Sequence, residues 1–224
     1  MKLLAVDTAL GACSAAVTDG EAVLAHRLEM MDRGHAERLA PMVSEVMDEA
    51  GIGFAALDRL GVTTGPGTFT GQRVGIAFMR GLRIALKRPL VGVTTLECMI
   101  AAALLESGLS AAAALHDAKR DEVYCAASLN GSVALPACLM TFDDALTHLW
   151  HMIGAAPLAI AGTAGERARV VWKAMGGTAV ATSIAQPDAL WVARLAAREP
   201  DPAGAPRPLY LREPDAKLPT PPRK

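Results

Sequence analysis

The order of predicted strands and helices repeats once along this chain of 224 residues. In the first half we expect strands at 2–7, 13–18 and 21–29, a helix at 35–50, a strand at 59–64, a helix at 69–87, a strand at 90–93 and a helix at 95–106. In the second half the same order gives strands at 111–117, 122–129 and 132–139, a helix at 142–152, a strand at 157–161, a helix at 164–175, a strand at 178–182 and a helix at 188–198. Asp19-Gly20 and Asn130-Gly131 stand at equivalent points, and each predicts a two-residue hairpin turn with positive φ. The repeat therefore predicts an α/β chain with two lobes of order βββαβαβα.

The segment from Gly65 to Leu86, GPGTFTGQRVGIAFMRGLRIAL, lies where a buried strand is followed by a helix. Its glycines permit an anion or another backbone to approach closely. The motif GxxxxGK[ST] is absent because Gln72 and Arg73 follow Gly71, and GxGxxG fails because Thr70 stands where the third glycine belongs. The segment therefore matches neither nucleotide-binding motif.

This segment resembles the signature GPGSFTGxRIGxxxAxGLA of the TsaB family, also called YeaZ. Three other stretches resemble the same family, namely the opening KLLAVDTALGACSAAV, the central HDAKRDEVYCAAS and the late LYLRE, so the likeness extends from Lys2 to Glu213. The resemblance implies two ribonuclease H-like lobes, as in the actin, hexokinase and Hsp70 superfamily. It also implies kinship with TsaD, the catalytic subunit of the bacterial tRNA threonylcarbamoyladenosine pathway.

The chain divides by composition into two lobes and a tail. We expect residues 1–106 to form a first lobe that carries a partner interface, and residues 107–199 to form a second lobe. Eight of the fourteen prolines lie in the segment 200–224, which excludes a helix or a central strand there. Leu209, Tyr210 and Leu211 form an apolar island that predicts partial docking of this tail, and a tail that is disordered throughout is the alternative.

Composition restricts the partners and the compartment. The net charge of −1 gives no general attraction for nucleic acid, so contact with tRNA is expected only through a complex. The scattered Cys13, Cys98, Cys125 and Cys138 predict reduced thiols, most simply four small core residues, in a cytoplasmic protein. The longest apolar run, at 98–105, is too short to cross a bilayer, and no membrane association is expected.

The first strand ends in Asp7-Thr8, at the place where kinases of the superfamily position metal and phosphate. The following residues, ALGA, lack the cationic groups that phosphate binding favours, so a vestigial phosphate site and a simple turn role for Asp7 both remain open. We assign no cofactor to the chain, although weak nucleotide binding stays possible and ATP would be used by the assembled complex.

No metal or hydrolytic site is predicted. TsaD-like relatives carry an HxxxH pair where this chain has Thr95 and Met99, neither of which suits a hard or borderline cation. His148 and His151 lack a further ligand at motif spacing and are expected on an ordinary helix face. No GxSxG elbow is present, and His116, Asp117 and Glu122 in HDAKRDEVY form at best a weak acid–base candidate.

The glycine-rich helix is predicted to bind a partner. Placed at 100° per residue, Val74, Phe78 and Leu82 share a face with Gly81 and Ala85 that should pack on the sheet. Arg73, Arg80, Arg83 and Ile76 then face outward, with Gly71 and Gly75 admitting a second helix, whereas a solvated face with an incidental isoleucine is the alternative. The full set of expected partner-binding residues is Gly65, Pro66, Gly67, Phe69, Thr70, Gly71, Arg73, Gly75, Ile76, Arg80 and Arg83, with Met42 and Met47 from the preceding helix.

The resemblance implies a non-catalytic scaffold or activator subunit. It would bind a TsaD-like catalytic subunit, act with a TsaE-like ATPase in threonylcarbamoyl transfer to adenosine of tRNA, and pair with itself when alone. An autonomous small-molecule kinase or a glycoprotease-like peptidase is the competing class.

Overall fold

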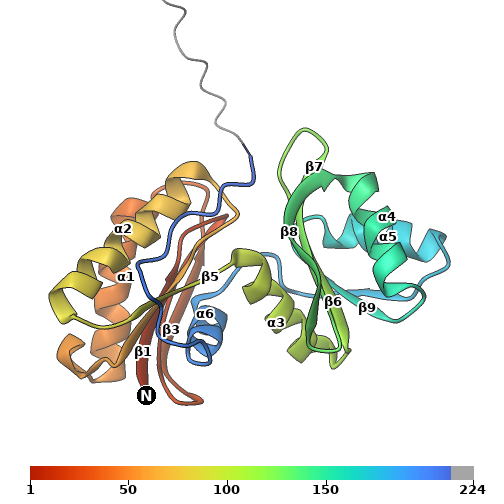
Figure 1. Ribbon diagram of the computed structural model, residues 1–224. Helices are drawn as coiled ribbons and strands as arrows, with labels where there is room; N and C mark the ends of the chain where they lie inside the picture. Colours follow the sequence, from red (N-terminus) through yellow and green to blue (C-terminus); the bar gives the residue numbers. More distant parts are fainter. Residues whose placement is uncertain (213–224) are drawn as a thin grey trace, which may run out of the picture.

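The computed structural model describes residues 1–212 and contains two five-stranded mixed sheets flanked by helices (Figure 1). The first half comprises β1 (Lys2–Asp7), β2 (Ala12–Asp19), β3 (Ala22–Met30), α1 (His35–Ala50), the 3-10 turn η1 (Phe54–Ala56), β4 (Arg59–Thr63), α2 (Phe69–Leu86), β5 (Leu90–Val93) and α3 (Thr95–Ser107). The second half comprises β6 (Ala111–Asp117), β7 (Glu122–Leu129), β8 (Ser132–Thr141), α4 (Phe142–Ile153), β9 (Leu158–Ala161), α5 (Gly165–Ala174), β10 (Ala179–Ala181) and α6 (Ala189–Ala196).

The two sheets share one topology. Their strand orders are β3-β2-β1-β4-β5 and β8-β7-β6-β9-β10, with the first three strands of each half antiparallel and the remaining pairs parallel. The predicted α/β fold with two βββαβαβα units is confirmed.

One of the two predicted hairpin turns lies at the predicted residues, and the other is shifted by one residue. Asn130 and Gly131 both have positive φ, at 52° and 77°, as predicted. In the first hairpin Asp19 still pairs with Ala22, so the turn consists of Gly20 and Glu21 rather than Asp19 and Gly20. Only Gly20 has positive φ there, which is the pattern of a turn with glycine at its first central position.

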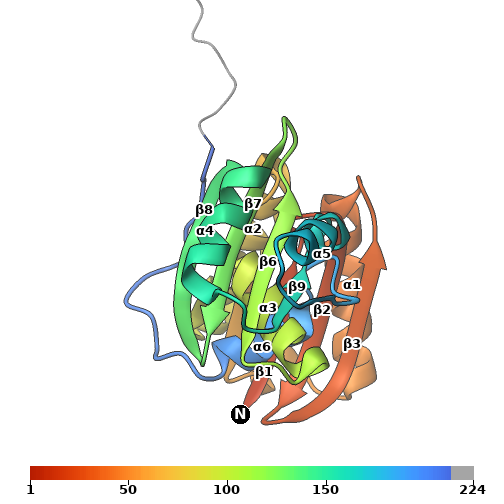
Figure 2. The same ribbon diagram turned by 90° about the vertical axis from the view of Figure 1, so that its right-hand side faces the viewer.

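Each half contributes one helix to the sheet of the other half. Helices α1 and α2 cover one face of the first sheet, but its opposite face packs on α6, which comes from the end of the second half. Helix α3 follows the first half and packs on the second sheet, whose other face carries α4 and α5, as Figure 2 shows from that side. The predicted division at residue 106 therefore separates α3 and α6 from the sheets on which they pack.

The proline-rich segment runs across the first lobe and reaches the second (Figure 1). Near its start, Asp201 pairs with Arg59 at 2.5 Å. Farther on, the amide of Leu209 donates to the carbonyl oxygen of Thr64 at 2.7 Å, and the Tyr210 ring stacks on Phe69. Arg212 then donates to the carbonyl oxygen of Ala118 in the second lobe, at 2.8 Å. The rest of the expected tail lies outside the described residues.

Candidate functional site

The glycine-rich junction before α2 is occupied by the chain itself. The amide of Thr68 donates to the carbonyl oxygen of Ala9 at 2.9 Å. A Cβ on Gly67 or Gly71 would overlap the carbonyl oxygens of Ala9 and Thr8, respectively. These glycines therefore permit close approach, as predicted, but the group that approaches is the β1–β2 turn of the same molecule.

Thr8 fixes this turn to the first turns of α2. Its hydroxyl donates to the carbonyl oxygen of Gly71 at 2.7 Å and accepts from the amide of Gly75 at 3.0 Å. A Cβ on Gly75 would lie 2.8 Å from that hydroxyl oxygen. The prediction that Gly71 and Gly75 face a partner helix is wrong, because both face Thr8 inside the lobe.

The start of α3 covers the other side of the junction. Thr95 donates from its amide to the Gly65 carbonyl oxygen at 2.9 Å and from its hydroxyl to the Pro66 carbonyl oxygen at 2.7 Å. Gly65 and Pro66 are buried beneath this contact, and Met99 is buried among apolar residues against the second sheet. Thr95 and Met99, which stand where relatives are expected to have histidines, are thus both committed to internal packing.

Asp7 is fully buried at the end of β1. Its Oδ1 atom accepts from the Thr63 hydroxyl at 2.5 Å and from the amide of Ala9 at 3.2 Å, whereas Oδ2 has no partner among the described residues. Burial raises the pKa of Asp7 to about 7, against the lowering effect of the Thr63 hydrogen bond. These bonds give Asp7 the turn role that was one of its two predicted alternatives.

The residues around Asp7 do not form a phosphate cradle. The amide of Ala9 is bound by Asp7, and the amide of Gly11 donates to the side-chain oxygen of Gln186 at 2.9 Å. Both amides are therefore already hydrogen-bonded, and the unpartnered carboxyl oxygen would repel an anion. The absence of a bound cofactor stays a prediction, and this arrangement favours it.

Helix α2 is rotated relative to its predicted orientation. Ile76 is only 3% exposed and packs in the core of the first lobe, so its predicted outward position is wrong. Met42 and Met47 of α1 are buried in the same core and are also not available to a partner. Because Thr8 draws the glycine edge of α2 inward, Ile76 and Met79 turn with that edge into the core, leaving Val74, Phe78 and Leu82 half-buried.

The exposed face of α2 combines small residues with a few large ones. Ala77, Gly81 and Ala85, at four-residue spacing, are exposed, and Ile84 beside them is 74% exposed. The neighbouring α1 exposes Ala36, Ala40 and Ser44 with acidic side chains between them. Together these residues form a surface of mostly small side chains, here called the α1–α2 face, whose backbone another helix could approach closely.

The tail lies along one edge of this face. Arg73 lies over the Phe69 ring, 3.5 Å from its centroid, and donates to the Tyr210 hydroxyl at 2.7 Å. Arg80 donates to the carbonyl oxygen of Pro206 at 2.6 Å. Arg73 and Arg80 are therefore directed toward the tail, whereas Thr70 is exposed.

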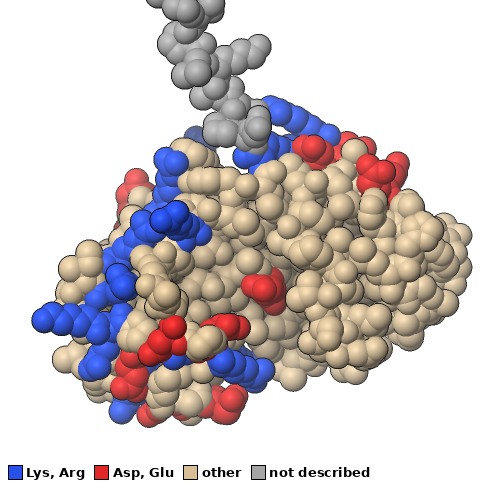
Figure 3. Space-filling model, in the orientation of Figure 1, with Lys and Arg blue, Asp and Glu red and all other residues tan. Residues whose placement is uncertain are grey.

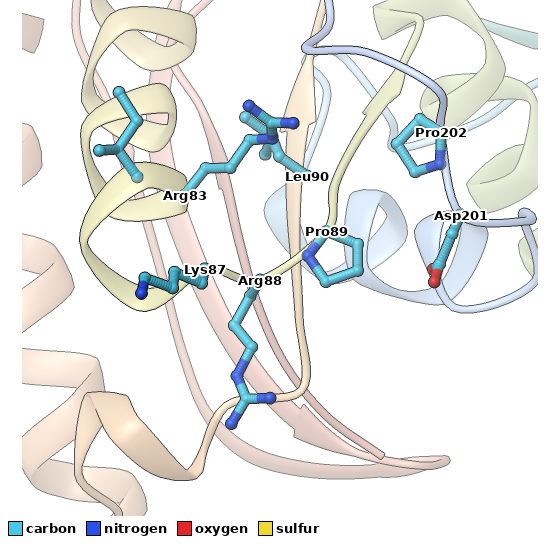
Figure 4. A pocket seen from close by; sticks show the side chains of 8 residues that line it. Arg83, Lys87, Arg88, Pro89, Leu90, Asp201 and Pro202 are labelled. Carbon is cyan, nitrogen blue, oxygen red and sulfur yellow. The ribbon is translucent and has the colours of Figure 1, made fainter.

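Basic side chains gather over the first lobe, as the space-filling view shows (Figure 3). At the end of α2, a hollow of about 450 Å³ is lined in part by Arg83, Lys87 and Arg88. Their side chains diverge in Figure 4, and Arg88 donates to the carbonyl oxygen of Ala55 at 3.2 Å. The hollow therefore does not focus several cations on one point, as a specific anion site requires.

The weak acid–base candidate in the second lobe does not converge. His116 and Asp117 are consecutive residues of β6 and point to opposite faces of the sheet, with His116 buried and Asp117 exposed. Burial lowers the pKa of His116 to about 4, and Glu122 is paired with Arg212. On α4, His148 bonds the carbonyl oxygen of Asp144 at 2.8 Å.

Neither a metal-binding cluster nor a membrane-spanning helix is found within residues 1–212. These residues contain no group of three or more His, Cys, Asp or Glu side chains placed to hold a metal ion. None of the helices in this range is both long and apolar enough to cross a membrane.

The fold defines a class of two-lobed α/β proteins. Component A of (R)-2-hydroxyglutaryl-CoA dehydratase from Acidaminococcus fermentans has a similar fold, with a TM-score of 0.54 over 88% of this chain and 97% of that one, at 11% identity. The family described as "TsaD: tRNA N6-adenosine threonylcarbamoyltransferase" matches residues 27–161.

Closer relatives narrow the class to one family. The solved structure of YeaZ from Pseudomonas aeruginosa has a TM-score of 0.68 at 31% identity, and the match covers 88% of this chain and 90% of that one. A second Pseudomonas aeruginosa structure, described as similar to peptidase YeaZ, has a TM-score of 0.74 at 32% identity and covers 94% and 99%. The chain belongs to the TsaB (YeaZ) family.

The Escherichia coli tRNA threonylcarbamoyladenosine biosynthesis protein TsaB is 38% identical to this chain over 126 residues. That match covers 56% of this chain and 54% of the relative, so it spans about half the length of the curated protein. An uncharacterized Mycobacterium tuberculosis protein is 34% identical over 217 residues and matches 96% of this chain and 93% of its own length.

Proposed function

We propose that this chain is a non-catalytic subunit of tRNA threonylcarbamoyladenosine biosynthesis that binds a TsaD-type catalytic subunit through the α1–α2 face. The relatives named for this pathway support the process. The exposed face of α2, with Ile84 next to the small residues Ala77, Gly81 and Ala85, is the observation that carries the binding role. A large apolar side chain exposed beside small residues on a helix is typical of a protein–protein interface.

Charge complementarity supports the same surface. The exposed acidic residues of α1 are Glu37, Glu45, Asp48 and Glu49, whereas α2 exposes Arg73 and Lys87. Glu45 and Glu49 are paired with Arg38 and Arg27, so Glu37 and Asp48 carry most of the charge offered to a partner. A partner with two similar helices could place its basic helix on α1 and its acidic helix on α2. The same complementarity permits a second copy of this chain to bind, which accounts for the homodimer that we expect when the catalytic subunit is absent.

The interior of the chain supports an accessory role over an autonomous kinase or peptidase. Asp7 Oδ1 and the Thr8 hydroxyl are engaged in internal hydrogen bonds, and His116 and Asp117 lie on opposite faces of β6. In this proposal the catalytic subunit and a TsaE-like ATPase supply the metal, the ATP and the reacting groups. The chain alone should accordingly show neither nucleotide hydrolysis nor stoichiometric metal, which a turnover assay and elemental analysis can check.

Substitutions on the exposed face of α2 test the proposal. Ile84→Asp and Gly81→Leu should each weaken binding to a TsaD-type subunit by about tenfold or more, because one buries an unpaired charge and the other holds the helices apart. Val133→Asp is the matched control, since Val133 is 69% exposed on β8 of the second lobe. Binding would be measured by calorimetry, and the melting temperature of each variant by itself would verify its fold. If Ile84→Asp and Gly81→Leu bind as tightly as the control, the interface lies elsewhere.

A further inference from the structure

Two of the four cysteines face each other across a pair of strands. Cys125 of β7 and Cys138 of β8 are register partners, and their sulfur atoms are 3.3 Å apart. Directly opposed residues of antiparallel strands have Cα atoms about 4.5–5.5 Å apart, which falls within the range of disulfide-linked cysteines. Cys13 and Cys98, in contrast, are buried in clusters packed on the first sheet.

The pairing depends on two irregularities in the hairpin. Next to the turn, Leu129 pairs with Ser132, and regular pairing from there would place Cys125 opposite Pro136. The register shifts on both sides of Ala127, which brings Cys138 into position instead. Proline has no amide hydrogen for the ladder, so a bulge near Pro136 is physically reasonable. The two cysteines are therefore neighbours that sequence spacing alone does not reveal.

The two thiols have different environments. Cys125 is fully buried, whereas Cys138 is partly exposed at the edge strand of the sheet. A hydrogen bond from the Cys125 thiol, aided by the nearby His148 on α4, lowers the pKa of Cys138 to about 7. The same bond and burial raise the pKa of Cys125. The geometry thus places a partly exposed thiol of lowered pKa, which also donates to the Cys125 carbonyl oxygen at 3.5 Å, at contact distance from a buried thiol.

We propose that Cys125 and Cys138 form a hydroperoxide-sensitive dithiol that closes to a disulfide between β7 and β8. The Cys138 thiolate attacks a peroxide oxygen, the O–O bond breaks, and the sulfur is oxidised to a sulfenic acid as hydroxide or alkoxide leaves. The Cys125 thiol then attacks the Cys138 sulfur, so that an S–S bond forms, the S–O bond breaks and water departs. Two thiols are oxidised while one hydroperoxide is reduced, and a dithiol reductant reverses the modification.

Thiol counting on the full, reduced chain tests this site. After treatment with hydrogen peroxide, maleimide labelling under denaturing conditions should find two of the four thiols protected, and peptide mapping should link Cys125 to Cys138. Reduction with dithiothreitol should restore all four thiols. Cys13→Ala should lose the same two thiols and serves as the matched control.

Single variants separate the two steps. Cys138→Ala should keep all its remaining thiols under the same treatment, and Cys125→Ala should accumulate a sulfenic acid at position 138 that dimedone traps. Alanine removes each thiol without adding a polar atom to this face of the sheet. Four labelled thiols after a peroxide dose that fully oxidises glutathione would overturn the proposal, as would a disulfide that joins two chains.

Discussion

The turn between β1 and β2 and the turn between β6 and β7 occupy equivalent places in the two lobes, but one is buried and the other is exposed. Residues 8–11 follow Asp7 at the end of β1, and residues 118–121 follow Asp117 at the end of β6. The first turn is largely buried against the glycine-rich junction. The second is mostly exposed, and its Lys119, Arg120 and Asp121 all have positive φ. One topology thus supports a sealed turn in one lobe and an open, charged turn in the other.

The difference lies in where the chain before the next helix meets the first strand and its turn. In the first lobe the amide of Thr68 donates to Ala9, and in the second the amide of Ala164 donates to the Leu115 carbonyl oxygen at 3.1 Å. Glycine allows the close approach in both, at Gly67 and Gly162. Only the first lobe adds Thr8, whose hydroxyl closes the turn onto α2. In the second lobe the contact therefore falls on strand β6, two residues before Asp117, and does not cover the turn that follows.

The largest effect is expected from filling the sealed junction. Gly71→Ala places a Cβ against the Thr8 carbonyl oxygen and should destabilise the protein by about 3 kcal/mol or more, because backbone must move to relieve the overlap. At about 2–4 °C per kcal/mol, the melting temperature should fall by roughly 10 °C.

Two alanine variants serve as controls for Gly71→Ala. Gly81→Ala in the same helix meets nothing within 4 Å and should stabilise by about 0.5–1 kcal/mol. Gly165→Ala, in the second lobe, would bring its Cβ to 3.2 Å from the Ile160 carbonyl oxygen and should have a small effect. Equal losses at Gly71 and Gly165 would show that contact with the β1–β2 turn is not what makes Gly71 sensitive.

The second effect concerns the two aspartates that end β1 and β6. The pKa of Asp7 is raised to about 7 in the folded protein, above the ordinary value of 3.8. The folded state then binds the extra proton between these values, so the contribution of Asp7 to stability is greatest below pH 4 and is lost as pH rises toward 7. Asp7→Asn mimics the neutral carboxyl and should gain stability over the parent protein across that range, by on the order of 1–4 kcal/mol at pH 8.

Comparison with Asp117→Asn isolates the effect of burial, because Asp117 is exposed and the same change there should give no such gain. The quantity to compare at each pH is the free energy of unfolding of the variant minus that of the parent, obtained by denaturant unfolding. This subtraction removes the contribution of His116, which is present in both proteins and has the opposite pH dependence. The pKa of His116 is lowered to about 4 in the folded protein. The folded protein therefore loses the stability that neutral His116 contributes as pH falls from about 6.5 to 4. A constant difference between Asp7→Asn and the parent from pH 4 to 8 would mean that Asp7 is ionised throughout.

The sequence predicts the fold well because local patterns determine it. Strand alternation, helix periodicity and the Asn130-Gly131 turn are short-range signals, and together they give the element order of both halves. The exchange of α3 and α6 between sheets leaves no such signal, because it depends on how the two halves face each other. The same limit applies to the register shifts that align Cys125 with Cys138.

The candidate site is harder to predict for a specific physical reason. Helical periodicity ranks the large apolar side chains of α2 and places Val74, Phe78 and Leu82 inward. The actual orientation follows from two hydrogen bonds to Thr8, which lies more than sixty residues earlier in the chain. A polar contact of this range cannot be read from periodicity. The predicted outward position of Ile76 and the predicted inward positions of Gly81 and Ala85 are therefore wrong, because Ile76 is buried and both small residues are exposed.

The smallest effect is expected at the open turn of the second lobe. Arg212 donates to the Ala118 carbonyl oxygen and pairs with Glu122, at the two ends of residues 118–122. Arg212→Ala should cost about 1 kcal/mol or less, because solvent screens a partly exposed pair. The informative readout is local, since amide hydrogen exchange in residues 118–122 should become faster while exchange in residues 8–11 is unchanged. Arg207→Ala, at an exposed position of the same segment, is the matched control. If exchange rises equally in both turns, the tail stabilises the lobes jointly, and the open turn of the second lobe does not depend on Arg212 alone.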